Sequence, residues 1–245
     1  TISDDENVCI GTADPDSFEN SANNFVISGS GSTGMTINSS NSGEVNMYFA
    51  DGTSGNEQYR GYFQYNHSSD FLQIGTAGAN QWKLDSSGNW LPSATDNGIY
   101  LGTTSATASN LLDDYEEGTW EATIQCGSGT VTLNSSNNLC KYTKIGRSVL
   151  LSGSLGVSSV SSPSGDLRIN GMPFPSGSGE GGERATGAFC LYNPTDGLPP
   201  ALIAQIFGGY ASIRIESSQA GDRSQSNHVQ GGSELRFTIN YQIGS

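Results

Sequence analysis

The strongest constraint on the fold of this chain is a period-two alternation of apolar and polar residues in short runs. The clearest run comprises Leu235, Phe237, Ile239, Tyr241 and Ile243, which are separated by single polar residues. Successive side chains of a β-strand point to opposite faces of its sheet, so this pattern is typical of a strand with one buried face. Similar runs recur along the chain between turn-forming clusters, and we expect an all-β protein.

The composition supports strands and turns rather than helices. Ser, Gly, Asn and Thr supply close to half of the 245 residues, whereas charged residues supply only 14%. Ser and Asn side chains compete for backbone hydrogen bonds, and Gly leaves the backbone too free, so these residues disfavour helix interiors. An α/β enzyme with long helices is therefore not expected, and only residues 106–115 suit one or two helical turns. No apolar stretch approaches the roughly 20 residues that a membrane-spanning helix needs.

The formal charge of −14 is concentrated in the first half of the chain. Residues 1–117 carry 16 acidic side chains against Arg60 and Lys83, whereas residues 118–245 carry eight acidic and eight basic ones. Neither half offers the basic surface that a phosphate backbone requires, which excludes nucleic-acid binding. The split predicts two modules: an acidic β-rich domain over 1–112, and a jelly-roll-like antiparallel β-sandwich over 113–245.

The first half has few residues with which to build a core. Its apolar runs are short, and each offers only two or three side chains to a buried face. Six such strands bury little apolar surface for about 95 residues, which is marginal for an isolated monomer. We therefore expect an oligomer in which other copies of the chain cover the exposed faces.

The motifs of cofactor binding and nucleophilic catalysis are not supported. Residues 29–34 match the letters of the dinucleotide fingerprint, but a strand-like run follows them instead of the helix that must receive the pyrophosphate. The two histidines, His67 and His228, are not accompanied by a Gly-x-Ser-x-Gly elbow, so a serine hydrolase has no support.

Two further groups of residues have simple structural explanations. Asp113, Asp114, Glu116 and Glu117 resemble the carboxylates of a glycosidase in kind, but four acids in five residues are more simply a solvated linker. The four cysteines form no CxxC pair, which disfavours a structural zinc site. They are most simply small buried hydrophobes, with a disulfide between Cys126 and Cys140, across neighbouring strands, as the alternative.

Several residues of the second half have the chemistry of a sugar-binding site. Proteins usually bind sugars by packing an aromatic ring on the C–H face while nearby amides and acids bond the hydroxyls. The alternative for each candidate is an ordinary loop or core residue. The candidate ligand-binding residues are Tyr192, Asn193, Asp196, Tyr210, Asp222, Arg223 and His228.

One block of the sequence resembles a known family. The segments LLDDYEEGTW at 111–120, YTKIG at 142–146 and GMPF at 171–174 follow one another in an order and spacing similar to the C-terminal region of bacteriophage tail-fibre proteins. The similarity is to the type found in marine and cyanobacterial phages. Segments that look like the shaft of this family are VCIGT at 8–12, DSSGN at 85–89 and YFADGTSG at 48–55.

The resemblance implies a homotrimeric fibre in the virion tail, joined to other phage tail proteins and carrying a host-recognition tip. Residues 1–112 would then be its shaft or shaft-proximal domain, and residues 113–245 its receptor-binding domain. It implies a binding protein, not an enzyme, whose ligand is a polysaccharide or lipopolysaccharide of the host surface. The acidic half would repel an anionic glycan, so we expect the neutral half to bind it. Two alternatives remain: a tailspike-like polysaccharide depolymerase, which needs a carboxylate pair in a groove, and a purely structural fibre component without a ligand.

The charge of the first half generates a first prediction. Three acidic copies side by side repel one another, and a divalent cation, Ca²⁺ or Mg²⁺, would bridge or screen them; no other cofactor is expected. A chelator should therefore lower the melting temperature at low salt, as measured by differential scanning calorimetry. An unchanged melting curve would remove this role for a cation.

Overall fold

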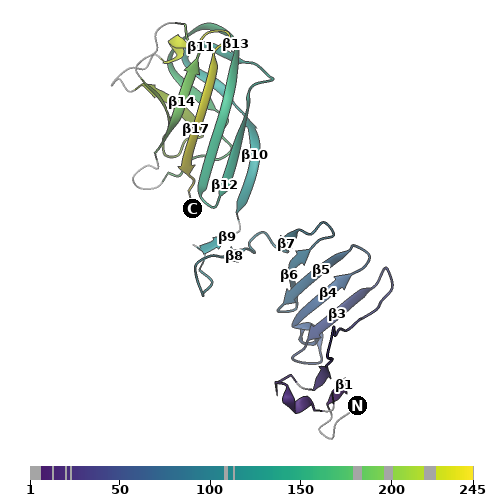
Figure 1. Ribbon diagram of the computed structural model, residues 1–245. Helices are drawn as coiled ribbons and strands as arrows, with labels where there is room; N and C mark the ends of the chain where they lie inside the picture. Colours follow the sequence, from purple (N-terminus) through teal and green to yellow (C-terminus); the bar gives the residue numbers. More distant parts are fainter. Residues whose placement is uncertain are drawn as a thin grey trace. The chain divides into compact units, whose positions relative to one another are not determined.

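The computed structural model describes residues 7–12, 14–19, 21–22, 24–107, 110–112, 114–178, 184–195, 201–217 and 225–244. The regular structure of these residues consists of β-strands and short 3-10 turns, which confirms the predicted all-β class (Figure 1). In this part of the chain no helix is long and apolar enough to cross a membrane. The chain divides into two compact units, Thr1–Asn97 and Gly98–Ser245.

The first unit begins with a small parallel pair of strands. β1 (Val8–Ile10) pairs with β2 (Phe25–Ile27), and the 3-10 turn η1 (Pro15–Ser17) lies between them in sequence. Cys9 and Val26 face each other in the register and are both buried, so they form the centre of this pair.

An antiparallel meander of five strands makes up most of the first unit. Its strands follow chain order and are β3 (Glu44–Phe49), β4 (Gly61–Asn66), β5 (Phe71–Thr76), β6 (Ala79–Leu84) and β7 (Trp90–Pro92), with η2 (Gly55–Tyr59) between β3 and β4. Only Ala77 and Gly78 join β5 to β6, and their φ angles of 56° and 72° suit a type I′ hairpin turn. Local turns therefore set the order of the sheet.

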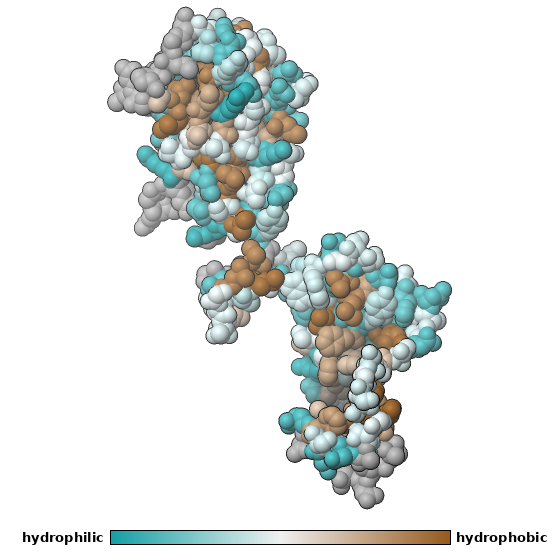
Figure 2. Space-filling view, viewed as in Figure 1, coloured by the Kyte–Doolittle hydropathy of each residue, from teal (hydrophilic) through white to brown (hydrophobic). Residues whose placement is uncertain are grey.

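One face of the meander is apolar from edge to edge. The register places Met47 beside Phe63, Phe63 beside Ile74, and Ile74 beside Trp82. Phe49 and Trp90 remain 55% and 56% exposed, and Figure 2 shows apolar residues at the surface of this unit. The face also holds Val45, Tyr65, Leu72 and Leu84.

The opposite face of the meander has a small aromatic cover. The Tyr62 ring lies over Gly75, where an added Cβ would come within 2.1 Å of it. Tyr48 and Tyr59 pack against Tyr62 with ring centroids 6.1 and 6.5 Å away. Tyr62 is consequently buried, and the apolar face is the side of the sheet that the described residues of this unit leave without a second layer.

The segment between residues 98 and 112 differs from the prediction. Residues 106–115 were expected to form helical turns, but Leu111–Leu112 is a strand, β9, which pairs with β8 (Ile99–Tyr100). Residue 115 already belongs to the next strand, β10. Backbone pairing between strands has outweighed the weak local preference of this stretch for a helix.

The second unit is organised by one long strand, β13 (Ser148–Asn170). Its first half pairs with β12 (Leu139–Ile145) and β17 (Glu234–Gln242), and its second half pairs with β11 (Thr123–Leu133) and β16 (Ser212–Ser217). Positive φ angles at Ser162 and Gly165 lie between the residues that pair with β17 and those that pair with β16. The strand therefore contributes to two sides of the unit.

The remaining strands close the sheet on itself. β16 pairs with β15 (Leu202–Ile206), β15 with β14 (Ala185–Tyr192), and β14 with β17, which returns to β13; β10 (Tyr115–Glu121) lies outside the ring on β12. This pairing is that of a small closed barrel. The sequence predicted two packed sheets, but β13 belongs to both sides and makes them one.

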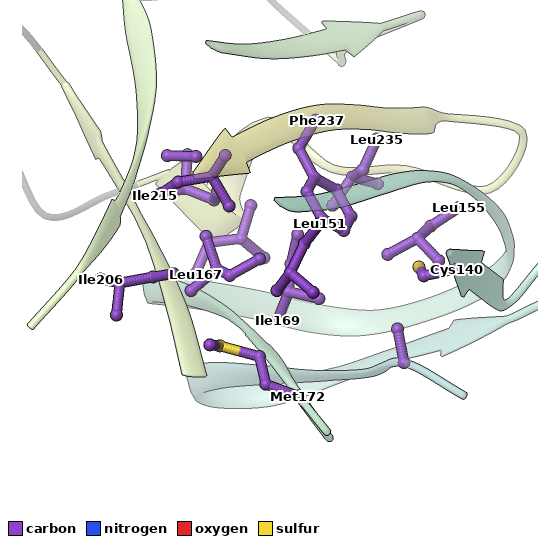
Figure 3. Packing of buried hydrophobic residues seen from close by; sticks show 14 of the residues in the cluster. Cys140, Leu151, Leu155, Leu167, Ile169, Met172, Ile206, Ile215, Leu235 and Phe237 are labelled. Atoms are coloured by element: carbon purple, nitrogen blue, oxygen red, sulfur yellow. The ribbon is translucent and has the colours of Figure 1, made fainter. Parts of the chain in front are cut away.

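A single hydrophobic core fills the barrel. Both halves of β13 supply fully buried side chains, and β12, β15, β16 and β17 supply most of the others (Figure 3). A Cβ added to Gly153 would come within 2.6 Å of the Phe237 ring, so this position on β13 leaves room for that ring. The fully buried members include Leu151, Leu155, Leu167, Ile169, Ile206, Ile213, Ile215 and Leu235.

The cysteines are free thiols and not a disulfide scaffold. Cys126 lies on β11 and Cys140 on β12, and both strands pair with β13 rather than with each other. Burial raises the pKa of the Cys140 thiol to about 12, so it stays protonated at neutral pH. Cys140 therefore acts as a small apolar core residue.

Neighbouring leucines on β13 test this description of the core. Leu151 is completely buried, so Leu151→Ala should destabilise the barrel by about 2–5 kcal/mol because it leaves a cavity. Leu150 is 45% exposed, and Leu150→Ala should change the free energy of unfolding by less than about 1 kcal/mol. Urea unfolding of the two variants measures the difference, and equal losses would contradict the assignment of faces.

Candidate functional site

The end of β14 leads into a tightly bonded loop. Asn193, directly after the strand, has a φ of 54°. Its backbone oxygen accepts hydrogen bonds from Ser233 Oγ (2.7 Å) and Gln230 Nε2 (3.3 Å), and its side-chain amide donates to Gly232 O (3.3 Å). Asn is one of the few residues that tolerate this left-handed conformation, because its short amide bonds locally.

A second set of hydrogen bonds ties this loop to η4 (Gln225–His228). Thr195 donates from its backbone to His228 O and from its hydroxyl to Asn227 O, each at 3.0 Å. Ser226, which is fully buried, donates to Gly165 O (2.8 Å) in the bend of β13. The segments after β14, within β13 and before β17 therefore form one loop cluster.

Tyr192 stands on the outer face of the barrel at the edge of this loop cluster. Its side chain is 62% exposed, and the Arg236 guanidinium lies 5.8 Å from the ring centroid. Glu234 is the register partner of Tyr192 across the β14–β17 pair and forms an ion pair with Arg236 at 2.6 Å. Ser154, on β13, donates a hydrogen bond to the Glu234 carboxylate. We call Tyr192, Glu234, Arg236 and Ser154 the tyrosine row.

Glu234 is held as an anion in this row. The hydrogen bonds from Arg236 and then from Ser154 lower its pKa to about 2. At neutral pH the carboxylate can therefore accept hydrogen bonds from ligand hydroxyls, but it has no proton to donate. This property suits recognition of a polar ligand better than general-acid chemistry.

An open groove runs across the outer face beside the tyrosine row. It crosses β13, β17 and β14, and small side chains such as Ala188 and Thr238 form its floor. The exposed Cys190 also lies along it. Its other lining residues are Gly153, Ser154, Phe189, Glu234, Arg236 and Phe237.

The structure brings together three of the residues predicted from sequence. Tyr192, Asn193 and His228 lie in or beside the loop cluster. Tyr210 lies elsewhere, in the turn between β15 and β16, where it donates its backbone N–H to Phe207 O at 3.2 Å. The other three predicted residues, Asp196, Asp222 and Arg223, lie outside the described residues.

Tyr210 belongs to a second groove that the sequence did not indicate. The groove is lined by Arg168, Arg184, Phe207, Gly208, Tyr210, Ser212 and Arg214. Two of these arginines occupy the same sequence pattern, with apolar neighbours on both sides: Leu167-Arg168-Ile169 and Ile213-Arg214-Ile215. This repeated pattern indicates that both guanidiniums lie on the outer face of their strands. It does not indicate that the two strands are neighbours, which only the pairing of β13 with β16 shows.

The carboxylates expected in a solvated linker are instead bonded within a sheet. Glu116 and Glu117 are on β10, and their carboxylates accept hydrogen bonds from Tyr142 and Tyr115. Asp114 forms an ion pair with Lys144, whose side chain is nearly buried. Asp113 lies outside the described residues. These three acids therefore have structural partners, and none of them lines the groove beside the tyrosine row or the second groove.

Metal-ligating side chains do not gather at either groove. Among the described residues, no group of three or more His, Cys, Asp or Glu side chains comes close enough to hold a metal ion. His67 and His228 belong to different units.

Comparisons with known proteins give one partial likeness. No protein-family model and no curated protein sequence matches the chain. Among solved structures, the crystal structure of Dettilon tailspike protein (gp208) is similar, with a TM-score of 0.43 and 22% sequence identity. The match covers 52% of this chain and 24% of that protein, so the matched half of this chain spans about a quarter of the length of that protein.

Proposed function

We propose that this chain is the distal part of a homotrimeric bacteriophage tail fibre, which attaches to a polysaccharide or lipopolysaccharide of the host surface. In this proposal residues 1–112 belong to the shaft and residues 113–245 form the receptor-binding tip. Ca²⁺ or Mg²⁺ between the acidic copies of the shaft is part of the same proposal. The resemblance of residues 111–174 to tail fibres supports it from the sequence.

The main support for the proposed binding role is the tyrosine row. Tyr192 offers a large, exposed ring against which a sugar can pack through its C–H face. Beside it, Arg236 and Glu234 fix each other in position and present charged donors and acceptors to sugar hydroxyls. Because these groups sit on paired strands, they are held in place before any ligand binds, which reduces the entropic cost of binding.

The apolar face of the meander supports self-association. A single-layer sheet with one uncovered apolar face is not an independently stable arrangement in water, since burial of that face is what stabilises a sheet. Further copies of the same chain would supply the missing layer. Three copies would also present three tyrosine rows, and such multivalency converts weak single contacts into firm attachment.

The apolar face predicts the native mass and its response to charge. Static light scattering should give about three times the 25.6 kDa of the chain. Met47→Asp places a charge on the apolar face and should reduce the mass toward that of a monomer. Asn46→Asp, on the neighbouring residue and the opposite face, should leave the trimer intact. A stable wild-type monomer would contradict the trimeric shaft.

The tyrosine row predicts how attachment responds to mutation. On an array of bacterial surface polysaccharides, Tyr192→Ala should lower the affinity of the full chain for its ligand at least about tenfold, equivalent to about 1.4 kcal/mol per site. Tyr115→Ala removes a ring of similar exposure from β10 and should have little effect.

Other outcomes of the same array distinguish the alternatives. Equal losses from the two tyrosine variants would contradict the assignment of the site. Release of reducing ends from a bound polysaccharide would identify a depolymerase instead. Absence of binding to every polysaccharide and to host cells would favour a structural fibre component.

A further inference from the structure

The second groove contains an unusual arrangement of like charges. Arg168 on β13 and Arg214 on β16 are direct register partners, and both point to the outer face of the barrel. Like charges directly opposite each other destabilise a pair of strands. An arrangement of this kind requires compensating negative charge nearby.

The described carboxylates compensate this pair only in part. Asp166 lies 3.3 Å from Arg214 and 3.7 Å from Arg168, and Glu216 lies 2.7 Å from Arg214. Arg214 thus has two close carboxylates, whereas Arg168 shares one at the longer distance. The better-paired guanidinium is also the more buried of the two.

A third arginine, Arg184, lines the same groove. The Arg184 guanidinium lies 5.2 Å from the Phe207 ring centroid, and that of Arg214 lies 5.8 Å from it. No described carboxylate forms an ion pair with Arg184, which is exposed. Among the described residues, the groove therefore brings three guanidiniums together against two carboxylates, in a chain whose formal charge is −14.

An exposed aromatic ring borders these charges. Tyr210 is 56% exposed. Its backbone N–H donates to Phe207 O (3.2 Å), and its backbone oxygen accepts from Ser176 N–H (3.1 Å). The Ser212 hydroxyl lines the same groove. The groove thus combines a ring that can pack on a sugar, a hydroxyl, and guanidiniums that can donate paired hydrogen bonds to a carboxylate.

We propose that this arginine groove binds an acidic saccharide, with a uronate carboxylate held by Arg184 and Arg168 and the sugar ring packed on Tyr210. Phe207 is a positioning residue, because its ring lies against both Arg184 and Arg214. The inference rests on the proposed function in so far as the acidic sugar belongs to the host glycan. The arginine groove would be a second binding site on the barrel, and it shares no residue with the tyrosine row. It would select glycans that carry carboxylates.

Isothermal titration calorimetry of the full chain with trigalacturonate tests the groove, with maltotriose as the neutral sugar of equal length. We expect trigalacturonate to bind and maltotriose not to bind. Arg184→Gln should weaken trigalacturonate binding at least about tenfold, because a charge-assisted pair of hydrogen bonds is lost. Arg147→Gln removes the same charge from an exposed turn of the barrel and should leave the affinity within about twofold.

Three results would overturn the inference: no binding of trigalacturonate, equal weakening by both arginine variants, or displacement of trigalacturonate by an equal concentration of inorganic phosphate. The last result would mean that the site binds bare anions.

The variant Tyr192→Ala separates this inference from the proposed function. If trigalacturonate fails to bind while Tyr192→Ala abolishes polysaccharide attachment, the proposed function stands and the arginine groove falls. If Arg184→Gln loses trigalacturonate while Tyr192→Ala keeps full attachment, the groove stands and the tyrosine row falls.

Discussion

The second unit depends on a single constraint: β13 must pair with different strands along its two halves. Between the residues that pair with β17 and those that pair with β16, Ser162 and Gly165 have positive φ angles, and the pairing with β11 shifts its register. In this irregular stretch Ser226 bonds to the backbone of Gly165, so the loop cluster is tied to the part of β13 where its partners change. Both grooves consequently lie on outer faces whose shape is set by β13.

The first unit differs from the second in how it buries its apolar side chains. A closed barrel buries its apolar side chains within one chain, whereas the meander leaves a row from Met47 to Trp82 facing outward. Hydrophobic burial is the dominant favourable term in folding, so the described residues of the meander gain less stability from burial than those of the barrel do. The two units therefore differ in how far their own described residues cover the apolar face of a sheet.

Local patterns in the sequence predicted the strands well and their partners poorly. The alternation over Leu235–Ile243 corresponds to β17, but nothing in it reveals that β17 pairs with both β13 and β14. The polar stretch around Ser162 gave no strand signal, because backbone pairing rather than burial of side chains keeps it extended. At the site, the pattern of an amide beside an aromatic ring identified Tyr192 and Asn193, whereas the arginine groove depends on register between distant strands and was missed.

The order in which the strands appear along the chain has a consequence for synthesis. Ser148 pairs with Gln242, so the ring cannot close until nearly all of the barrel sequence has left the ribosome. Until then one edge of β14 and one edge of the first half of β13 carry unpaired backbone groups, and open edges of this kind pair readily with other chains. Translation therefore passes through a stage in which neighbouring nascent chains compete with β17 for the same two edges.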